Sequence, residues 1–307
     1  MNRSEMRAAK KKKRKWLYIP LIIIGLLVLA VGIWAGLIYN DARKTVNEKM
    51  YTDIDSIDSE ISKKKIKGKE ELNILLLGID AEEGGAGRSD TIIVLNLRPE
   101  EDKMQLISIP RDTRTLIVGR GTEDKINHAY AFGKEKMAVD TVENFLGIEL
   151  DYYIDMNMTG LIELIDELGG ITVNNDIAWS DKKYDFNVGQ NDLDGDKALA
   201  YVRMRKQDPA GDFGRAKRQR QVIEAIIDKG ANLATVTSIS NMIEILGDNM
   251  HTSLDFSDMT KLATGYSSAR KNVEQYQMQG TGTMIGGIYY YIVPEEEVQK
   301  VHNMIIN

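Results

Sequence analysis

Three short apolar runs between residues 74 and 109 form the clearest pattern in the chain. They are Ile74–Leu77, Thr91–Leu97 and Gln105–Ile109, which are rich in Ile, Leu and Val and are bounded by Gly, Asp or Pro. Apolar runs of this length between such residues form buried strands more often than helices. The pattern therefore predicts three buried strands.

Helical and extended patterns alternate in the next part of the chain. Apolar residues fall on one helix face up to Leu146, and Gly147 follows as a residue suited to end the helix. The pattern then predicts a strand at Tyr152–Met156, a helix at Thr159–Leu168 and a strand at Ile171–Val173. Strands that alternate with helices indicate an α/β fold, in which helices cover the faces of a sheet.

The remaining segments give weaker signals. Residues 176–196 are polar and predict a mobile loop that could act as a flap. From Asn232 onward the sequence shows two amphipathic helical patterns and then the apolar run Gly287–Val293. A closing helix is expected to begin at Pro294, because proline is favoured in the first helical position.

The N-terminal region has the charge pattern of a membrane anchor. Residues 1–16 hold eight Lys or Arg and one acid, and no charged residue occurs from Leu17 to Tyr39. This uncharged run exceeds the roughly 20 residues that a helix needs to span a bilayer. The positive-inside rule places residues 1–16 in the cytoplasm and everything after Asn40 outside the membrane. A cleavable signal peptide is the alternative, and it also exports the main domain.

The expected organisation has four parts. A cytoplasmic basic tail (1–16) precedes a transmembrane signal-anchor helix (17–39), and a charged extracytoplasmic stem (40–71) leads to the extracellular main domain (72–307). The stem is expected to be helical or loose and to lift the domain off the membrane, with its charges in solvent.

Composition excludes several kinds of site. The 307 residues include no cysteine, which excludes disulfides, thiolate zinc sites and Cys nucleophiles. The 3 histidines are far apart in sequence, so a His-rich metal site or a Ser-His-Asp triad is a weak candidate. The net charge is −6, and because residues 1–16 carry +7, the remainder carries −6 − 7 = −13. An acidic body with a basic tip argues against nucleic-acid binding.

Charged residues gather at the ends of the three predicted strands. Asp80 follows the first run, Arg88 and Asp90 precede the second, and Arg111 and Asp112 follow the third. In α/β folds, functional groups lie at strand ends and in the adjoining loops. Acids and arginines gathered in this way suit a metal-bound phosphate. The alternative is that these are solvated turn charges with local roles.

A second charged stretch lies between residues 198 and 221. Arg203 and Arg205 are two residues apart, so on an extended segment they would point to the same side. A helical run is expected from Arg215 to Lys229, with Arg215, Arg218 and Gln219 on one face near its N-terminus. Cations there oppose the helix dipole, and a bound anion would explain them. The alternative is a surface basic patch paired with neighbouring acids.

The motifs, taken in order, resemble the LytR–CpsA–Psr family of bacterial cell-wall proteins. The resemblance rests on the basic tail with one anchor and on NILLLGID, GRSDT, SIPRD, INHAYAFG, ALAYVRMR and DFGRAKRQRQVI. It implies a three-layer α/β/α sandwich with a central mixed sheet that holds a polyprenyl pyrophosphate. It also implies transfer of a glycopolymer, wall teichoic acid, from that lipid carrier onto a sugar hydroxyl of peptidoglycan.

The resemblance further implies roles for single residues. Asp80 and Asp90 correspond to acids near the pyrophosphate and a Mg²⁺ ion, or Mn²⁺ in its place, and one Asp could take the proton of the sugar hydroxyl. Arg111 is expected to join these two acids in catalysis. The residues expected to bind the pyrophosphate are Arg88, Arg111, Arg203, Arg205, Arg215, Arg218 and Gln219.

Elementary chemistry agrees with these expectations. Guanidinium groups match phosphate oxygens in bidentate fashion, and Mg²⁺ takes one or two carboxylates together with substrate phosphates. We therefore expect the two arginine groups, although about a hundred residues apart in sequence, to converge on one pyrophosphate. A hydrolase of the same lipid pyrophosphate, and a non-enzymatic membrane-anchored regulator that binds lipid head groups, are the alternative functions.

Overall fold

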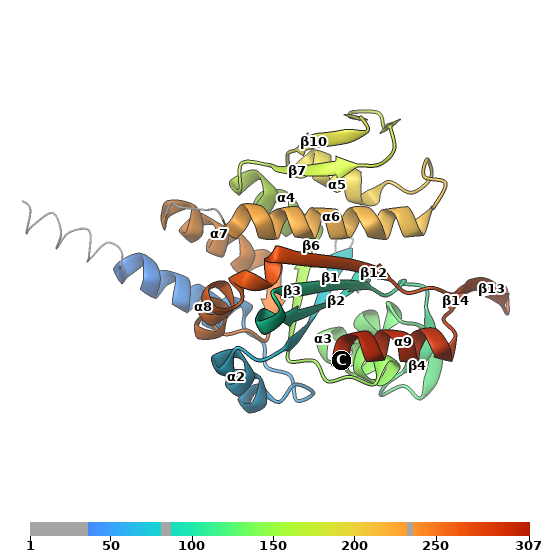
Figure 1. Ribbon diagram of the computed structural model, residues 1–307, viewed down its shortest axis with the longest axis horizontal. Coiled ribbons are helices and arrows are strands. Elements are labelled where there is room, and N and C mark those ends of the chain that lie inside the picture. The colour runs from blue at the N-terminus through green and yellow to red at the C-terminus, as the bar shows by residue number, and fades with distance from the viewer. Residues whose placement is uncertain (1–35, 81–86, 232–235) are drawn as a thin grey trace, which may run out of the picture.

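The computed structural model describes residues 36–80, 87–231 and 236–307 (Figure 1). The predicted basic tail and all but the last four residues of the predicted anchor lie outside these ranges. Within them, no helix is both long and apolar enough to cross a membrane.

A mixed six-stranded sheet lies at the centre of the domain. Its strand order is β11-β6-β1-β2-β3-β12, with bounds Met250–Thr252, Tyr152–Asn157, Leu72–Asp80, Arg88–Arg98, Lys103–Ser108 and Asn272–Gln277. β2 runs antiparallel to both β1 and β3, whereas β6 is parallel to β1 and β12 is parallel to β3. The predicted α/β domain with a central mixed sheet is confirmed, as are the three predicted buried strands.

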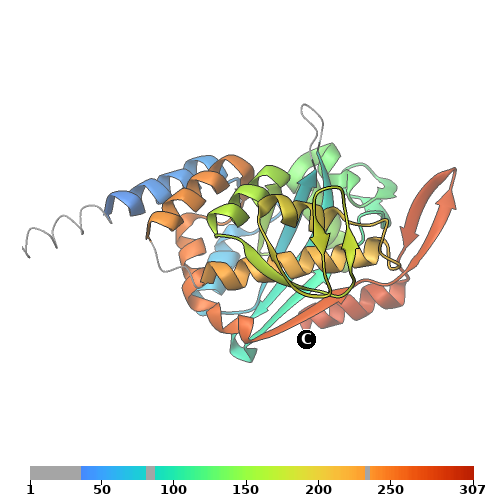
Figure 2. The same cartoon turned by 90° about the horizontal axis from the view of Figure 1, so that it is seen from above.

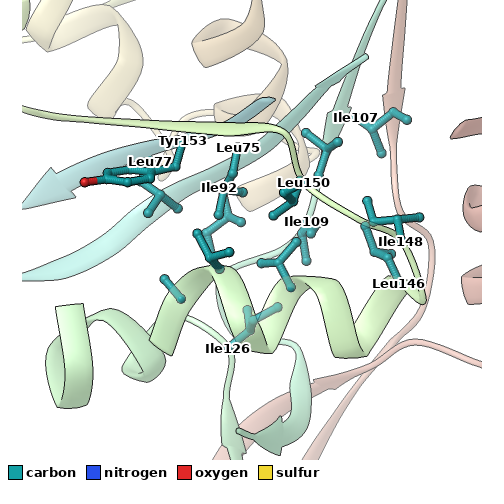
Figure 3. Packing of buried hydrophobic residues seen from close by; sticks show 14 of the residues in the cluster. Leu75, Leu77, Ile92, Ile107, Ile109, Ile126, Leu146, Ile148, Leu150 and Tyr153 are labelled. Carbon is teal, nitrogen blue, oxygen red and sulfur yellow. The ribbon is translucent and has the colours of Figure 1, made fainter. Parts of the chain in front are cut away.

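Helices cover both faces of this sheet (Figures 1 and 2). Leu75, Leu77 and Ile92 point to the face covered by α3 and α9 and pack there with Val139 and Val301 (Figure 3). The alternate strand residues point to the opposite face, where α2, α6 and α8 contribute apolar side chains. Burying one such side chain contributes about 2 kcal/mol, so the alternation fixes which face of each strand meets which helices.

The helix bounds agree well with the sequence pattern. The α-helices from residue 59 onward are α2 Ser59–Gly68, α3 His128–Leu146, α4 Met158–Glu167, α5 Gly195–Arg203, α6 Asp212–Ala231, α7 Val236–Asn249, α8 Phe256–Gly265 and α9 Glu295–Ile306. A short π-helix, η1 (Val46–Met50), and two short 3-10 helices, η2 (Pro99–Glu101) and η3 (Ser267–Lys271), also occur in the described residues. Gly147 ends α3 in the left-handed conformation, as predicted. α9 begins at Glu295 with Pro294 as its N-cap, so the helix starts one residue later than predicted.

A separate apolar cluster lies above α6 in Figure 1, around β7 (Ile171–Asn175) and β10 (Gly189–Leu193). The segment expected to be a mobile flap contributes β8 (Trp179–Ser180) and β9 (Asp185–Phe186), and Trp179 stacks on Phe186 with ring centroids 3.9 Å apart. Both aromatic side chains are buried. The segment is therefore packed rather than loose, contrary to its polar composition.

Residues expected to form a separate stem pack against the domain. Residues 36–45 are helical, and the side chains of Val46 and Met50 in η1 are buried against Met250 of β11. Further along, Ile57 belongs to the apolar cluster beneath the sheet. The packed body therefore begins well before residue 72.

Two hairpins lie at the end of the sheet that carries the charged residues. One consists of β4 (Arg114–Ile117) and β5 (Thr122–Lys125), and the other consists of β13 (Thr281–Ile285) and β14 (Ile288–Ile292). Figure 2 shows the β13–β14 hairpin projecting from the body. Its turn contains Gly286 and Gly287, both with positive φ, which glycine adopts without a Cβ penalty.

Candidate functional site

A cavity of about 270 Å³ lies where the start of β2, the end of β3 and the start of α6 meet. Its polar lining includes five of the residues singled out in the sequence, Asp90, Arg111, Arg205, Arg215 and Gln219. Its apolar and aromatic lining includes Ile92, Ile109, Phe213, Tyr289 and Tyr291. The fold thus brings together segments that are up to two hundred residues apart in the chain.

Asp90 and Arg111 form a close ion pair on one wall of this cavity. Arg111 Nη1 donates to Asp90 Oδ2 at 2.6 Å, and Asn127 Nδ2 donates to the other carboxylate oxygen at 3.4 Å. Asn127 is buried, and its own Oδ1 has no hydrogen-bond partner in the described part of the chain. An unpartnered buried amide oxygen is costly, so the surroundings of Asp90 retain an acceptor for a donor or a cation, although Asn127 does not itself line the cavity.

Arg215 at the start of α6 and Arg205 from the loop before this helix also line the cavity. Arg205 and Arg215 both contact Asp212, with nitrogen to oxygen distances of 3.2 and 2.9 Å. Burial lowers the pKa of Arg215, and the nearby Arg111 lowers it further. Because α6 begins here, its unpaired N–H groups add positive potential to the cavity. The cavity therefore favours an anion with several oxygens.

The two arginine groups expected to converge do so in part. Arg111 follows β3, whereas Arg205 and Arg215 come from the second stretch, and all three line one cavity. A second contact also crosses between the groups, since Arg203 Nη2 lies 3.3 Å from Asp80 Oδ1.

Four of the predicted site residues lie outside the cavity lining: Asp80, Arg88, Arg203 and Arg218. Asp80 and Arg203 are exposed, and so is Arg88, whose Cα is paired with that of Asp80 across β1 and β2. Arg203 is the last residue of helix α5, so the extended geometry considered for Arg203 and Arg205 is not what forms. The i, i+2 spacing therefore does not set the relative direction of these two side chains.

Arg218 occupies a different environment from the other predicted ligands. Its side chain is buried, its Nη1 donates to Asp208 Oδ2 at 2.6 Å, and its Nη2 donates to the carbonyl of Met204 at 2.7 Å. The structure therefore does not bring Arg218 into the lining with Arg215 and Gln219. Its contacts tie the loop between α5 and α6 to the helix, which fixes the position of Arg205 within that loop.

A second polar cluster lies near the other edge of the sheet, between β6, β11 and α3. Ligand atoms of Glu135, Asp155 and His251 all lie within 4.8 Å of one another, and these side chains could hold a metal ion. Tyr130 Oη lies 3.2 Å from a carboxylate oxygen of Glu135 and of Asp155, and His251 Nδ1 lies 3.0 Å from Asp155. Burial raises the pKa of Glu135, and contact with Asp155 raises it further.

Sequence reasoning missed this cluster as well as Asn127, Tyr289 and Tyr291. Asn127 stands inside the motif INHAYAFG, which marked the segment but not the residue. The two tyrosines and the cluster of Glu135, Asp155 and His251 give no local signal, because their partners lie on other elements, from about 20 to more than 100 residues away in sequence.

Comparisons with known proteins agree with this geometry. The LytR_cpsA_psr family model matches residues 37–307. The polyisoprenyl-teichoic acid–peptidoglycan teichoic acid transferase TagU of Bacillus subtilis is 44% identical over 297 residues, covering 96% of this chain and 97% of TagU.

Two solved structures extend the comparison to the fold. The crystal structure of B. subtilis TagU matches with a TM-score of 0.64 and 42% identity, covering 76% of this chain and 94% of that one. The structure of TagT bound to LIIa-WTA matches with a TM-score of 0.67 and 32% identity, covering 84% and 94%. The family model spans nearly the whole chain, and the chain therefore belongs to the LytR–CpsA–Psr family.

Proposed function

We propose that this protein is an enzyme that transfers wall teichoic acid from a polyprenyl pyrophosphate carrier to peptidoglycan. One observation carries the proposal: Arg111, Arg205 and Arg215, from distant parts of the chain, line a single cavity. The names of the related TagU proteins and the occupant of the TagT structure support it. Three guanidinium groups that line one cavity suit an anion with several oxygens, and a pyrophosphate offers enough oxygens for all three.

The lining residues suggest how the donor would lie. The arginines and Gln219 would hold the pyrophosphate, and the N-terminus of α6 would face its negative charge. Phe213, Tyr289 and Tyr291 would contact the less polar neighbours of the pyrophosphate, a sugar ring or the first prenyl unit. Exposed Arg88 and Arg203 would act at the rim, and Arg218 would act by holding the loop that carries Arg205.

The proposed reaction is a phosphoryl transfer. A sugar hydroxyl of peptidoglycan attacks the phosphorus that carries the glycopolymer, and the bond from that phosphorus to the prenyl phosphate oxygen breaks. Prenyl monophosphate leaves, and the hydroxyl proton passes to a carboxylate, either Asp80 or Asp90. Arg111 orients Asp90 and neutralises charge at the phosphates, which is the main demand of this chemistry.

Asp80 and Asp90 are the residues proposed to hold Mg²⁺, or Mn²⁺ in its place. The site fits a hard cation, because the carboxylate of Asp90 adjoins the unpartnered amide oxygen of the buried Asn127. When bound, such an ion would neutralise part of the phosphate charge. Glu135, Asp155 and His251 form a separate group that could hold a metal, and no step of the transfer is assigned to them.

The cell membrane is the proposed location, with the catalytic domain outside. The basic residues 1–16 would lie in the cytoplasm and residues 17–39 would cross the bilayer, so that the cavity stays near a lipid-borne donor. Protease added to intact protoplasts is expected to digest the domain. Protection of the domain in intact protoplasts, with digestion after lysis, would contradict this location.

Product analysis tests the proposed activity. Lipid-linked glycopolymer incubated with the enzyme and peptidoglycan is expected to yield polymer-bearing peptidoglycan and prenyl monophosphate. Asp90→Asn should lower the rate by about 100-fold or more, because it removes the charge that Arg111 orients. Asp196→Asn, which alters an exposed carboxylate paired with Lys183, is the matched control and should retain full activity.

The outcome without acceptor separates the alternatives. Release of polymer at the same rate without peptidoglycan would identify a hydrolase that uses water. Absence of any product, with tight binding of the lipid, would instead identify a regulator. Either result contradicts the transferase.

A further inference from the structure

Arg220 of α6 carries a buried charge that the proposed mechanism does not use. Its side chain is 5% exposed and lies one residue beyond Gln219. Its Nη1 donates to Ser108 Oγ at 2.6 Å and its Nε donates to Gln275 Oε1 at 3.3 Å. The carboxylate one turn further along the helix, Glu224, accepts from Gln275 instead. Within the described residues, no carboxylate lies within 4.0 Å of the Arg220 guanidinium.

The other buried arginines of the described chain are paired with acids. Arg98 is also 5% exposed, and its guanidinium contacts Glu71 at 3.4 Å. Arg218 contacts Asp208 at 2.6 Å. Arg220 differs from both because its hydrogen-bond partners are neutral. Burial lowers the pKa of Arg220 to about 10, so the group remains charged at neutral pH.

Ser108 joins Arg220 to the cavity. Ser108 is the last residue of β3, is buried, and belongs to the cavity lining. Its Oγ accepts the hydrogen bond from Arg220, and the described residues provide no acceptor for its hydroxyl hydrogen. A hydroxyl that accepts from a cation becomes a stronger donor through its own hydrogen. The Ser108 hydroxyl is thus suited to donate to an anion in the cavity, with the guanidinium directly behind it.

We propose that Arg220 is a positioning residue that supplies buried positive charge to the anion in the cavity and acts through Ser108. The inference rests on the proposed function, because it needs a pyrophosphate in that cavity. A guanidinium buried among neutral groups is destabilising in the ligand-free protein. A bound pyrophosphate offsets this cost by interacting with the charge across a medium of low dielectric constant.

The proposal predicts effects of opposite sign on stability and on binding. Replacing Arg220 by Gln keeps a donor for Ser108 but removes the charge. The ligand-free Arg220→Gln protein should therefore melt at a temperature equal to or higher than that of the wild type. Its affinity for pyrophosphate should fall about tenfold. A residue with a purely structural role would lower the melting temperature and leave the affinity unchanged.

The experiment uses the full chain in detergent micelles and inorganic pyrophosphate with Mg²⁺ as the probe. Calorimetry gives the dissociation constant, and a thermal melt gives the stability of each ligand-free protein. Arg220→Lys keeps the charge and should retain most of the affinity that Arg220→Gln loses. Arg98→Gln is the matched control, because it removes a buried arginine that has an acid partner. It should melt at a lower temperature and bind pyrophosphate like the wild type.

Ser108→Ala tests whether Arg220 acts on the bound anion through Ser108. This test does not depend on the stability of the Arg220 variants. It should weaken pyrophosphate binding, and adding Arg220→Gln to it should cause less than the product of the two separate losses. Wild-type affinity in both Arg220→Gln and Ser108→Ala would overturn the inference while leaving the proposed function intact. Failure of the wild type to bind pyrophosphate would overturn the proposed function, and the inference with it.

Discussion

The arginine cavity and the cluster of Glu135, Asp155 and His251 both crowd like charges near an edge of one sheet. The two sites differ in how the repulsion between these charges can be reduced. An arginine stays protonated at neutral pH, so Arg111, Arg205 and Arg215 need anions. Asp90 and Asp212 supply two, and a third, Asp112, is shared between Arg111 and Lys125.

A carboxylate, in contrast, can gain a proton. Burial raises the pKa of Glu135, and the hydrogen bond to Asp155 raises the pKa of His251, so this cluster can lower its own negative charge without a ligand. The contrast teaches that a crowd of arginines is the stronger evidence for a bound ligand.

The largest expected effect is on the shared ligand of the cavity. Arg111→Ala and Arg215→Ala should each weaken pyrophosphate binding by tenfold or more, because each removes a charge-assisted contact at about 1.5–3 kcal/mol. The double variant should lose less than the product of the two losses, because both groups contact the same anion. Calorimetry with inorganic pyrophosphate measures all four affinities.

Arg120→Ala is the control for this comparison, because Arg120 is exposed, lies outside the lining and has no role in the proposed site. It should change the affinity by less than threefold. If the double variant lost affinity by the full product of the two single losses, Arg111 and Arg215 would bind separate anions. The cavity would then not be a single pyrophosphate site.

A smaller effect, on the melting temperature, is expected from the cluster of Glu135, Asp155 and His251 when the pH is varied in metal-free buffer. Because the pKa of Glu135 is raised in the folded protein, its protonated form contributes stability that is complete below the ordinary value of 4.5. This contribution is lost as the pH rises through the raised value. The pKa of His251 is also raised, so its protonated form likewise contributes stability that is complete below pH 6.5 and is lost as the pH rises through the raised pKa. Glu135→Gln should therefore flatten the decline of melting temperature with rising pH, by a few degrees at most.

Adding Zn²⁺ to the same melts asks whether the cluster takes a cation in place of the proton. The melting temperature of the wild type should rise, and the rise should be absent in Glu135→Gln and His251→Gln. His128→Gln is the matched control, because His128 contacts Asp124 at 2.8 Å in a simple histidine–acid pair. Equal shifts in all variants would show that Zn²⁺ binds elsewhere. An unchanged pH profile in Glu135→Gln would contradict the raised pKa of Glu135.

Much of the fold could be predicted, because its central strands carry their own signal. β1, β2 and β3 are short runs of Ile, Leu and Val that need burial on both faces, whichever helices cover them. Trp179 and Phe186 show the opposite case. They lie within a polar segment and are buried because residues of other elements, among them Tyr201 of α5, pack around their stacked rings. A local pattern cannot reveal a partner that the fold supplies.

The residues of the candidate site also fall into those with a local signal in the sequence and those that depend on distant partners. Asp90 and Arg111 could be picked out because acids and arginines gather at the ends of the predicted strands, and Arg215 because a cation near a helix N-terminus opposes the helix dipole. The sequence did not distinguish Arg215, which lines the cavity, from Arg218, which Asp208 holds, although both follow the same helical spacing. Nor could it mark Arg220, whose significance depends on the lack of an acid beside it in space.

The β13–β14 hairpin makes the chain convenient to label. The protein contains no cysteine, so a single cysteine in place of Met284, a side chain that is 62% exposed, would be the only thiol available to a fluorescent maleimide. Met284 pairs with Tyr289 across the hairpin, and Tyr289 lines the cavity. A dye on that cysteine would sit across one strand pair from the cavity wall and outside the packed clusters. Its emission would then follow the filling of the cavity in real time without any change to the residues that hold the ligand.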